Sequence, residues 1–362
     1  MKKVFFIIPT LTQGGAERVI ITLLKFLDKT KFKATIMIVN MNEEVYSKEI
    51  PEEVDIIDLK CNRVRTAIPK IIFNLWRFKP NIVMSTLGHL NIAIAMSRVF
   101  MPSGIKFIAR ETIVVSEKLS RGKFQKMWKL LHRIFYPSFD KIICQSEDMR
   151  RDISDILGSE KNLVLINNPV DYENIQKLLS LSDTGAKDFF DNESYIYFVA
   201  AGRLIEQKGF ELLIEAIALV NNPQVRLAIL GHGPLEEKLY SLIESFGLHN
   251  QVILPGYQGN PYAWMAKADA FILSSHYEGF PNVVLEALSC GTQVIATPAP
   301  GGTQEILEPI VGCFISKEIT AISLAKTISM YIDSEKKKIS EKELVPYKPH
   351  TICEKYTSTF LS

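Results

Sequence analysis

Short apolar runs alternate along the chain with glycine-bearing turns and amphipathic segments. An apolar run of this length is typical of a strand buried on both faces, and the amphipathic segments are typical of helices that cover such strands. Strands that alternate with helices predict an α/β fold with parallel, doubly wound sheets. The strands are expected at Val4–Pro9, Ala34–Val39, Ile82–Ser85, Lys106–Ala109, Lys141–Gln145, Tyr195–Ala201, Val225–Leu230, Val252–Leu254 and Ala270–Ser274.

The alternation is interrupted once, near the middle of the chain. The residues N-N-P-V-D at Asn167–Asp171 break the pattern, and a polar region follows them up to Glu193. A length of 362 residues also suits two domains, at about 100 to 200 residues each. We therefore expect two Rossmann-like domains, residues 1–170 and 171–348, with a last helix at about 349–362 that packs back on the first domain.

Charge is divided unevenly between the two halves. Residues 1–170 contain 27 Lys/Arg and 17 Asp/Glu, whereas residues 171–362 contain 15 and 23. Within residues 60–133, 15 basic residues accompany only Glu111 and Glu117, and aromatic residues are interspersed among them. Such a mixture suits a surface that lies on anionic lipid headgroups. A nucleic-acid surface and a solvated surface of no special role are the alternatives, and we expect the membrane and no nucleic acid.

The cysteines and the amino terminus indicate a cytoplasmic protein. Five scattered cysteines without a C-x-x-C pair predict neither a disulfide framework nor a zinc site. The opening M-K-K-V-F-F-I-I-P-T resembles a signal peptide, but its apolar run ends at Pro9 and is too short for one. No apolar run reaches the 18 residues that a membrane-spanning helix needs.

A glycine pair lies near the start of the first domain. Gly14 and Gly15 follow the strand at Val4–Pro9 and precede a helix expected from about Ala16 to Leu27. A strand, a glycine turn and a helix form the arrangement that binds phosphate, because glycine lets the backbone approach the ligand and a helix start favours an anion. The glycines can equally serve only the conformation of the turn.

Two cations and two carboxylates follow strands of the second domain. Arg203 and Lys208 lie five residues apart after one strand, where a pair of fixed cations can stabilise a diphosphate leaving group. Alone, each would more often form a surface salt bridge. Glu278 lies in a Gly/Pro turn, and Glu286 lies in the second turn of a helix that begins near Pro281, so they serve separate tasks. A turn acid and a solvated helix residue are the alternative.

Six motifs occur in order along the chain: G-G-A-E-R, N-N-P-V-D, G-R-L-x-x-x-K-G, G-H-G-P-L, Y-Q-G-N-P-Y and E-G-F-P-N-V-V-L-E-A-L-x-x-G-T-x-V-I-A-T. Together they resemble the retaining glycosyltransferases of the GT-B fold and the family 4 type, which include many enzymes of O-antigen and lipid-linked oligosaccharide assembly. The match is dense over about 195–310 and thinner over 1–170. The resemblance implies two facing Rossmann-like domains, with a nucleotide-sugar donor on the second and the acceptor on the first.

The resemblance also implies roles for residues of the second domain. Arg203 and Lys208 would contact the diphosphate, and Glu278 would lie by the donor sugar, which makes these three the catalytic candidates. Glu286 would accept hydrogen bonds from the ribose hydroxyls. Tyr257 and its neighbour would meet the base, although packing is an equal alternative for Tyr257. The donor-binding set is Gly15, Gly231, Tyr257, Gln258, Gly279, Phe280, Asn282, Val283 and Glu286. His232, where many relatives have an acid, is given no catalytic role.

The first domain departs from the family pattern. Many relatives carry a histidine near the end of the strand at Lys106–Ala109, where this chain has Arg110 and Glu111. With Gly14 and His89 these two residues are the acceptor or cleft candidates. His89 can also be an ordinary loop residue.

The sequence contains no D-x-D motif, which usually supplies the oxygen ligands that hold a divalent metal on the diphosphate. We therefore expect transfer without a metal or other cofactor. The hypothesis is a retaining transfer in which the departing phosphate oxygen helps remove the acceptor proton. The expected donor is a UDP-linked hexose or N-acetylhexosamine, and GDP-mannose is the alternative. The expected acceptor is a polyprenyl-diphosphate-linked or other lipid-linked glycan, met at the inner face of the plasma membrane. A sugar-nucleotide epimerase or hydrolase and a non-catalytic binding subunit remain competing hypotheses.

Overall fold

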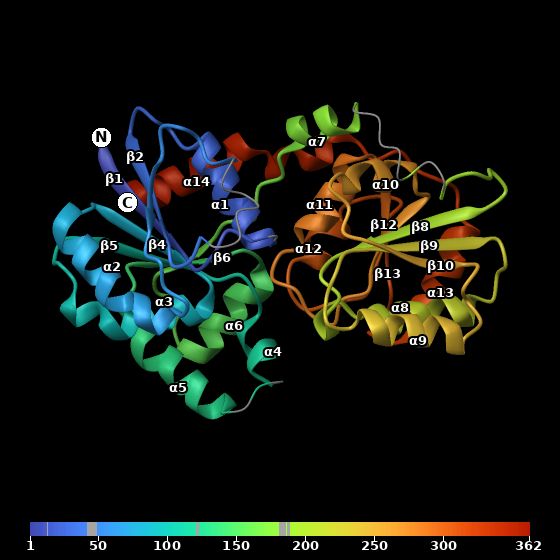
Figure 1. The fold of residues 1–362 in the computed structure, drawn as a ribbon, viewed down its shortest axis with the longest axis horizontal. Coiled ribbons are helices and arrows are strands. Elements are labelled where there is room, and N and C mark those ends of the chain that lie inside the picture. Colours follow the sequence, from blue (N-terminus) through green and yellow to red (C-terminus); the bar gives the residue numbers. More distant parts are fainter. Residues whose placement is uncertain (13, 42–48, 121, 123, 181–185, 187–188) are drawn as a thin grey trace. The chain divides into compact units, whose positions relative to one another are not determined.

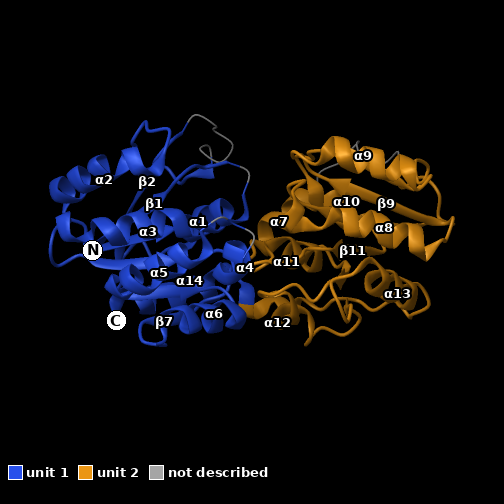
Figure 2. Ribbon diagram, turned by 90° about the horizontal axis from the view of Figure 1, so that it is seen from below, with its two compact units in different colours: residues 1–169, 347–362 blue, residues 170–346 orange. Residues whose placement is uncertain are grey.

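The computed structural model describes residues 1–12, 14–41, 49–120, 122, 124–180, 186 and 189–362. The chain divides into two compact units, and each has its own parallel sheet (Figure 1, Figure 2). Unit 1 comprises residues 1–169 and 347–362, and unit 2 comprises residues 170–346. The boundaries expected from the sequence were after residue 170 and near residue 349.

Unit 1 is built on a seven-stranded parallel sheet of order β3-β2-β1-β4-β5-β6-β7. Its strands are β1 (Lys2–Ile8), β2 (Phe32–Ile38), β3 (Asp55–Asp58), β4 (Ile82–Thr86), β5 (Lys106–Arg110), β6 (Lys141–Cys144) and β7 (Leu163–Leu165). β1 pairs with β2 on one side and with β4 on the other, so the strand order reverses between β1 and β4.

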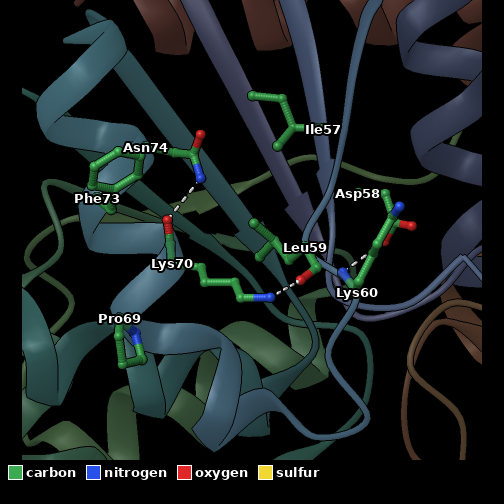
Figure 3. Close-up of a pocket in the computed structure, with 8 residues that line it drawn as sticks. All are labelled: Ile57, Asp58, Leu59, Lys60, Pro69, Lys70, Phe73 and Asn74. Atoms are coloured by element: carbon green, nitrogen blue, oxygen red, sulfur yellow. Dashed lines mark hydrogen bonds between the residues drawn. The ribbon is translucent and has the colours of Figure 1, made fainter.

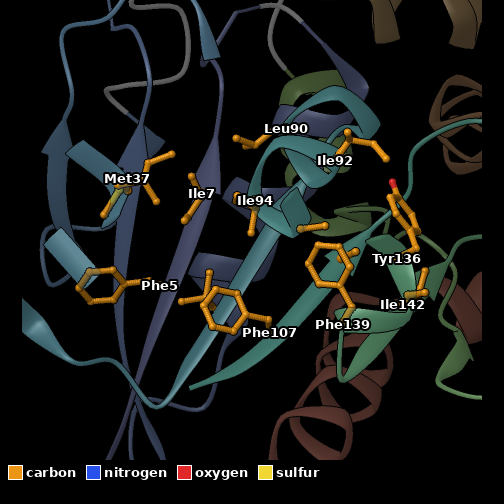
Figure 4. Packing of buried hydrophobic residues seen from close by; sticks show 14 of the residues in the cluster. Phe5, Ile7, Met37, Leu90, Ile92, Ile94, Phe107, Tyr136, Phe139 and Ile142 are labelled. Atoms are coloured by element: carbon orange, nitrogen blue, oxygen red, sulfur yellow. The ribbon is translucent and has the colours of Figure 1, made fainter. Parts of the chain in front are cut away.

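Helices cover both faces of this sheet. They are α1 (Gly15–Phe26), α2 (Val64–Phe78), α3 (Gly88–Ser97), α4 (Val115–Ser120), α5 (Gln125–Phe135), α6 (Glu147–Leu157) and α14 (Pro349–Leu361), with short 3₁₀ turns η2 (Arg98–Phe100) and η3 (Tyr136–Ser138). Successive strand side chains point to opposite faces. Phe5 and Ile7 therefore pack with the helices α2, α3 and α6, whereas Phe6 and Ile8 pack with α1 and α14. Figure 4 shows Phe5 and Ile7 on the side of the sheet that α3 covers with Leu90, Ile92 and Ile94.

The last helix belongs to the core of unit 1. The Phe360 ring of α14 lies 6.3 Å from the ring of Phe6 and 5.6 Å from that of Phe32, both in edge-to-face geometry. Lys106 Nζ on β5 donates a hydrogen bond to the Thr359 carbonyl at 2.7 Å. The end of the chain thus completes a face of a sheet that begins at its second residue (Figure 1).

Unit 2 is built on a six-stranded parallel sheet of order β10-β9-β8-β11-β12-β13. Its strands are β8 (Ile196–Ala201), β9 (Val225–Leu230), β10 (Val252–Gly256), β11 (Ala270–Leu273), β12 (Gln293–Ala296) and β13 (Phe314–Ile315). Its helices are α7 (Tyr172–Leu179), α8 (Phe210–Val220), α9 (Glu236–Ser245), α10 (Pro261–Lys267), α11 (Asn282–Ser289), α12 (Thr303–Leu307) and α13 (Ala321–Ile332), with 3₁₀ turns η4 (Glu206–Lys208) and η5 (Glu341–Tyr347). The strand order reverses between β8 and β11.

The predicted fold class, two doubly wound parallel sheets, is confirmed. All nine predicted strands occur, with ends within two residues of those expected. Four strands were not predicted: β3, β7, β12 and β13. They are two to four residues long, and β3 (D-I-I-D) is partly exposed at the edge of its sheet, so their apolar pattern is too short to be distinguished from a loop.

Candidate active site

The reversal of strand order in unit 2 determines where its chemical groups meet. The loops that follow the two central strands, residues 202–209 after β8 and residues 274–281 after β11, leave the same edge of the sheet. In an open α/β sheet, the reversal of strand order is where ligands bind, outside the carboxyl ends of the strands. The first loop carries Arg203 and Lys208, and the second carries Glu278.

An ion pair joins these two loops. Lys208 Nζ lies 2.7 Å from Glu278 Oε1, and the side chains are 19% and 7% exposed. The hydroxyl of Ser275 donates to the same carboxylate oxygen at 2.6 Å. Ser274 Oγ donates to the Lys208 carbonyl at 2.9 Å. The Lys208 and Glu278 side chains therefore hold one another in place, and the Lys208 backbone is held by Ser274.

Arg203 differs from Lys208 because it is exposed. Within the part of the chain that the structure describes, no carboxylate lies within ion-pair distance of its guanidinium. One of the two cations is thus already balanced by a carboxylate, and the other is open to an anion from solution. This arrangement can accept a diphosphate without first breaking an ion pair at Arg203.

Two glycines allow the loops to approach one another. Gly209 has φ +61°, and a Cβ there would overlap the carbonyl oxygen of Ser274. Gly231, a predicted donor-binding residue, has φ +135°, and a Cβ there would overlap the carbonyl oxygen of Gly202. The left-handed backbone and the close contact both require glycine at these positions. Glycine is therefore needed at position 231 because the loop that carries Arg203 packs directly against it.

The segment after Glu278 leads directly into α11. Gly279 accepts a hydrogen bond from the backbone of Gly302 at 2.8 Å, and Phe280 is buried. Asn282 and Val283 begin the helix and are half-buried, and Glu286 is buried in its second turn. The two carboxylates thus stand on different elements, a loop and a helix, as expected for separate tasks.

Tyr257 and Gln258 lie in the loop after β10. The Tyr257 side chain is 48% exposed, which disfavours the alternative of a packing residue. The backbone N–H of Tyr257 donates to His232 Nε2 at 3.2 Å, and His232 Nδ1 lies 3.2 Å from Glu236 Oε2. Gln258 Nε2 donates to the Pro255 carbonyl at 2.9 Å. His232 therefore braces the loop that carries Tyr257, a role that its position between two glycines does not indicate.

Ser275 is a further residue that the sequence did not single out. It is fully buried, and Thr297 Oγ1 donates to its carbonyl at 2.6 Å. Its hydroxyl orients the Glu278 carboxylate through Oε1. The only signal in the sequence is a serine three residues before the glutamate, which is too common a spacing to identify it.

The glycine pair of unit 1 begins α1. Gly14 caps the helix, and Gly15 is its first residue. The carboxylate of Glu17 folds back over Gly14, where a Cβ would overlap it. An acidic side chain of the chain itself therefore lies beside the helix start at which an anion was expected. This placement favours the conformational role of the glycine pair over phosphate binding.

Arg110 is the last residue of β5 and Glu111 follows it. As successive residues, they point to opposite faces of the sheet. Both are buried, with exposures of 0% and 1%. The structure thus places both side chains in the interior of unit 1. Glu111 Oε1 accepts hydrogen bonds from Asn91 Nδ2 at 2.9 Å and from the hydroxyl of Tyr136, whose ring is shown in Figure 4. Burial and the Glu111 carboxylate raise the pKa of Tyr136 well above its usual value.

His89 is the second residue of α3 and is exposed at the surface. Partial desolvation of its ring and the ammonium of Lys118 lower the pKa of His89, and the carboxylate of Glu111 opposes them. The ring is therefore neutral at neutral pH and can donate one hydrogen bond and accept another. Of the four acceptor or cleft candidates, it is the one whose side chain is accessible.

Unit 1 also has a surface pocket of about 550 Å³ between the end of β3 and α2 (Figure 3). It is lined by Ile57, Asp58, Leu59, Lys60, Pro69, Lys70, Phe73 and Asn74. Lys70 Nζ donates to the Leu59 carbonyl at 2.7 Å, which ties the helix to the strand end. None of the sequence-predicted site residues lines this pocket.

The described residues contain no group of three or more His, Cys, Asp or Glu side chains that could hold a metal ion. Among the helices that the structure describes, none is both long and apolar enough to cross a membrane.

Comparison with known proteins adds the family to this geometry. Residues 13–174 match the family described as Glycosyltransferase Family 4, and residues 183–345 match the one described as Glycosyl transferases group 1. An N-acetylgalactosamine-N,N'-diacetylbacillosaminyl-diphospho-undecaprenol 4-alpha-N-acetylgalactosaminyltransferase of Campylobacter jejuni is 31% identical over 319 residues, which cover 84% of this chain and 83% of the relative. The chain belongs to glycosyltransferase family 4. The resemblance drawn from the six motifs is thereby confirmed, and the protein is an enzyme of the glycosyltransferase class.

Two further comparisons extend over the length of this family 4 glycosyltransferase. A second Campylobacter jejuni protein, a GalNAc-alpha-(1->4)-GalNAc-alpha-(1->3)-diNAcBac-PP-undecaprenol alpha-1,4-N-acetyl-D-galactosaminyltransferase, is 28% identical over 362 residues, with 92% of this chain and 90% of the relative covered. The crystal structure of Anabaena Alr3699/HepE in complex with UDP and glucose has a TM-score of 0.81 at 18% identity, with 100% of both chains covered. At this sequence identity, the similarity to the Anabaena structure shows a shared fold.

Proposed function

We propose that this glycosyltransferase transfers an N-acetylhexosamine or hexose from a UDP-sugar to a polyprenyl-diphosphate-linked or other lipid-linked glycan in surface polysaccharide synthesis. The observation that carries the proposal is the cluster of Lys208, Glu278 and Ser275 at the strand-order reversal of unit 2, with the exposed Arg203 on the same loop as Lys208. Two relatives named for undecaprenol-linked acceptors support the acceptor class.

In this proposal the two cations serve the leaving group. As the bond between the sugar and the diphosphate breaks, negative charge grows on the departing phosphate oxygen. Arg203 and Lys208 stabilise that charge in place, which lowers the barrier without reorganising solvent. Glu278 holds Lys208 at 2.7 Å and lies by the donor sugar. Glu286 accepts hydrogen bonds from the ribose hydroxyls.

The proposed transfer retains the anomeric configuration and needs no metal ion. The acceptor oxygen bonds to the anomeric carbon on the face from which the diphosphate leaves. The acceptor proton passes to the departing phosphate oxygen, so no separate general base is required. Arg203 and Lys208 supply the positive charge that a divalent cation supplies in other transferases.

An amphipathic face of unit 1 supports peripheral binding to an anionic membrane, at the inner face of the plasma membrane. On α5 the side chains of Met127, Leu130 and Ile134 are exposed at spacings of three and four residues, beside the exposed Lys126. Unit 1 has further exposed apolar side chains on α2 and η2, namely Phe73, Trp76, Val99 and Phe100. The indole N–H of Trp76 donates to the Phe100 carbonyl at 2.9 Å, which joins these two elements. Basic and bulky apolar groups on one helix suit a lipid headgroup layer.

A panel of sugar nucleotides tests the donor. The intact protein is heated with each UDP-sugar and with GDP-mannose. We expect UDP-N-acetylhexosamine or UDP-hexose to raise Tm, since a ligand at 100 times its Kd stabilises the folded state by about 2.7 kcal/mol. If GDP-mannose alone raised Tm, the donor nucleotide in the proposal would be GDP and not UDP.

The stabilising donor is then incubated with synthetic polyprenyl-diphosphate sugars, with and without a chelator. We expect a product extended by one sugar, formed at the same rate in both conditions, with the anomeric configuration of the donor. Donor turnover without acceptor would indicate an epimerase or hydrolase. Donor binding without product on any acceptor would indicate a binding subunit.

A further inference from the structure

A fully buried arginine lies where the chain leaves unit 1. The Arg110 side chain has no exposed surface and is the largest fully buried side chain of the described residues. Its three nitrogens donate to neutral oxygens: Nε to the Tyr356 hydroxyl at 3.1 Å, and the other two to Thr86 Oγ1 at 3.3 Å and Asn168 Oδ1 at 2.6 Å. No carboxylate of the described residues forms an ion pair with it. Arginine is almost never fully buried without a charged partner, so its partners require an explanation.

The chain first passes from unit 1 to unit 2 between Pro169 and Val170, and we call this segment the first connection. One partner of Arg110, Asn168, belongs to it. Asn168 precedes Pro169, the last residue of unit 1 before residue 170 begins unit 2. Gln145 secures the same connection: its backbone carbonyl accepts from Asn167 Nδ2 at 2.9 Å, and its Oε1 accepts from Asn168 Nδ2 at 3.1 Å. The connection is thus held at the carboxyl ends of β5 and β6.

Beyond Pro169 the chain is fixed again within a few residues. Asp171 caps α7 by accepting a hydrogen bond from the Asn174 backbone. Gln176 Nε2 donates to the Ser289 carbonyl at 2.7 Å. Ser289 ends α11, the helix that carries Glu286. The first connection is therefore short and anchored on both sides, in unit 1 by Arg110 and in unit 2 at α11.

The other partner, Tyr356, lies in the helix that follows the second connection. The chain re-enters unit 1 at Tyr347 and forms α14 from Pro349, and Tyr356 lies in the second turn of that helix. The Tyr356 hydroxyl accepts from Arg110, and its ring is fully buried beside Phe360. A single guanidinium thus bonds to Asn168, at the end of the first stretch of unit 1, and to α14, the helix that follows the return of the chain to unit 1. Figure 2 shows the two units in different colours.

We propose that Arg110 is a positioning residue for transfer: within unit 1 it ties the departure point of the first connection, at Asn168, to the helix that follows the second connection, and so limits the relative motion of the two units. The inference rests on the proposed function, in which the donor lies on one unit and the acceptor on the other. Hinges of this kind consist of a few residues far from the reacting atoms, and their loss changes turnover rather than the chemistry of either half-site.

Single-molecule fluorescence transfer on the full chain tests the proposal. Dyes are placed at Lys161 in unit 1 and Lys326 in unit 2, both exposed, after replacement by cysteine. We expect Arg110→Met to widen the distance distribution at least twofold. We also expect kcat to fall by roughly 10- to 100-fold, as for misplacement of reacting groups by about 1 Å. Donor affinity should stay within about twofold, because Arg203, Lys208 and Glu278 lie on unit 2.

Two isosteric variants separate positioning from stability. Asn168→Leu removes the bond to the first connection and should widen the distribution as Arg110→Met does, even where the latter folds poorly. Thr86→Val removes a bond of the same guanidinium that touches neither connection, so the distribution should keep its width. Wild-type distributions in Arg110→Met and Asn168→Leu, or equal widening in Thr86→Val, would overturn the proposal. The distance distribution is measured without substrates, so this outcome is independent of whether the proposed transfer occurs.

Discussion

The ion pair between Lys208 and Glu278 is the residue-scale feature on which the proposed chemistry rests. A lysine ammonium is a compact, flexible point charge. Here its position is limited by the Glu278 carboxylate, by the Ser274 hydroxyl on its backbone and by Gly202 beneath its methylene groups. A cation held in this way meets developing charge without a large change of geometry.

Replacing Lys208 by alanine should abolish most of the transfer activity. Removal of one preorganised group that stabilises developing charge costs roughly 10² to 10³ in kcat. The matched control is Lys238→Ala, since Lys238 also pairs with a glutamate of unit 2 but its side chain is 68% exposed. Initial rates of sugar transfer check both variants. Transfer by Lys208→Ala within a few-fold of wild type would remove Lys208 from the diphosphate assignment.

At the scale of elements, the close packing of loops in unit 2 depends on glycines with left-handed backbones. Gly209 and Gly247 have similar φ values, +61° and +66°. Only Gly209 has a neighbour, the Ser274 carbonyl, whereas nothing lies within 4 Å of a Cβ at Gly247. The two sites therefore separate the cost of backbone conformation from that of the loop contact.

Gly247→Ala should lower the free energy of unfolding by about 1–2 kcal/mol, the cost of the left-handed conformation for a residue with a Cβ. Gly209→Ala should cost clearly more, because the β8 and β11 loops must also separate. Urea unfolding measures both. Equal losses in the two variants would show that the loops do not need the close approach.

The amphipathic helix α5 gives a second prediction at this scale. Replacing Lys126 and Lys129 of α5, together with Lys118 of α4 and Lys123, by glutamate should reduce binding to anionic liposomes, since each lysine near such a surface contributes about 1 kcal/mol. Lys123 lies outside the described residues. The difference from wild type should shrink as salt is added. Flotation of liposomes measures it, with the same replacement at Lys2, Lys31, Lys33 and Lys161, exposed in unit 1, as the control. Unchanged flotation of the variant at Lys118, Lys123, Lys126 and Lys129 would contradict the membrane proposal.

At the scale of the whole molecule, the last helix, α14, packs in the same core as the first strand, β1. Phe360→Ala should lower the free energy of unfolding of unit 1 by about 3–5 kcal/mol, the usual cost of truncating a buried phenylalanine. Its neighbour Leu361 is 45% exposed, so Leu361→Ala should change stability by no more than about 0.5 kcal/mol. Thermal and urea unfolding compare the two. A small loss in Phe360→Ala would mean that unit 1 folds without α14.

The chain's local pattern was sufficient to predict both sheets. Runs such as V-R-L-A-I-L at Val225–Leu230 and the helix at Phe210–Val220 have the lengths and periods that predict their type. The two-residue β13 and the edge strand β3 lack such a pattern, because strands this short and exposed depend on their neighbours for stability.

The candidate site was predictable in part. The sequence predicted that Arg203, Lys208 and Glu278 follow strands of the second domain, and loops after parallel strands lie at one edge of the sheet. The pattern could not show that Ser275 bonds to Glu278, that His232 braces Tyr257 or that Glu17 covers Gly14. These contacts depend on rotamers and on distances of a few ångströms between loops.

The sequence by itself determined the two doubly wound sheets and the loops that carry charge, because hydrophobic period and turn chemistry act over a few residues at a time. Only the tertiary structure decided the surroundings of Arg110 and Glu111, adjacent residues that the sequence marks as acceptor or cleft candidates and that are both buried. One side of β5 gives Arg110 the partners Tyr356 and Asn168, and the other gives Glu111 the hydroxyl of Tyr136. Which partners a residue meets across a sheet depends on strand order and on the return of the last helix, and these are set by contacts between segments far apart in the chain.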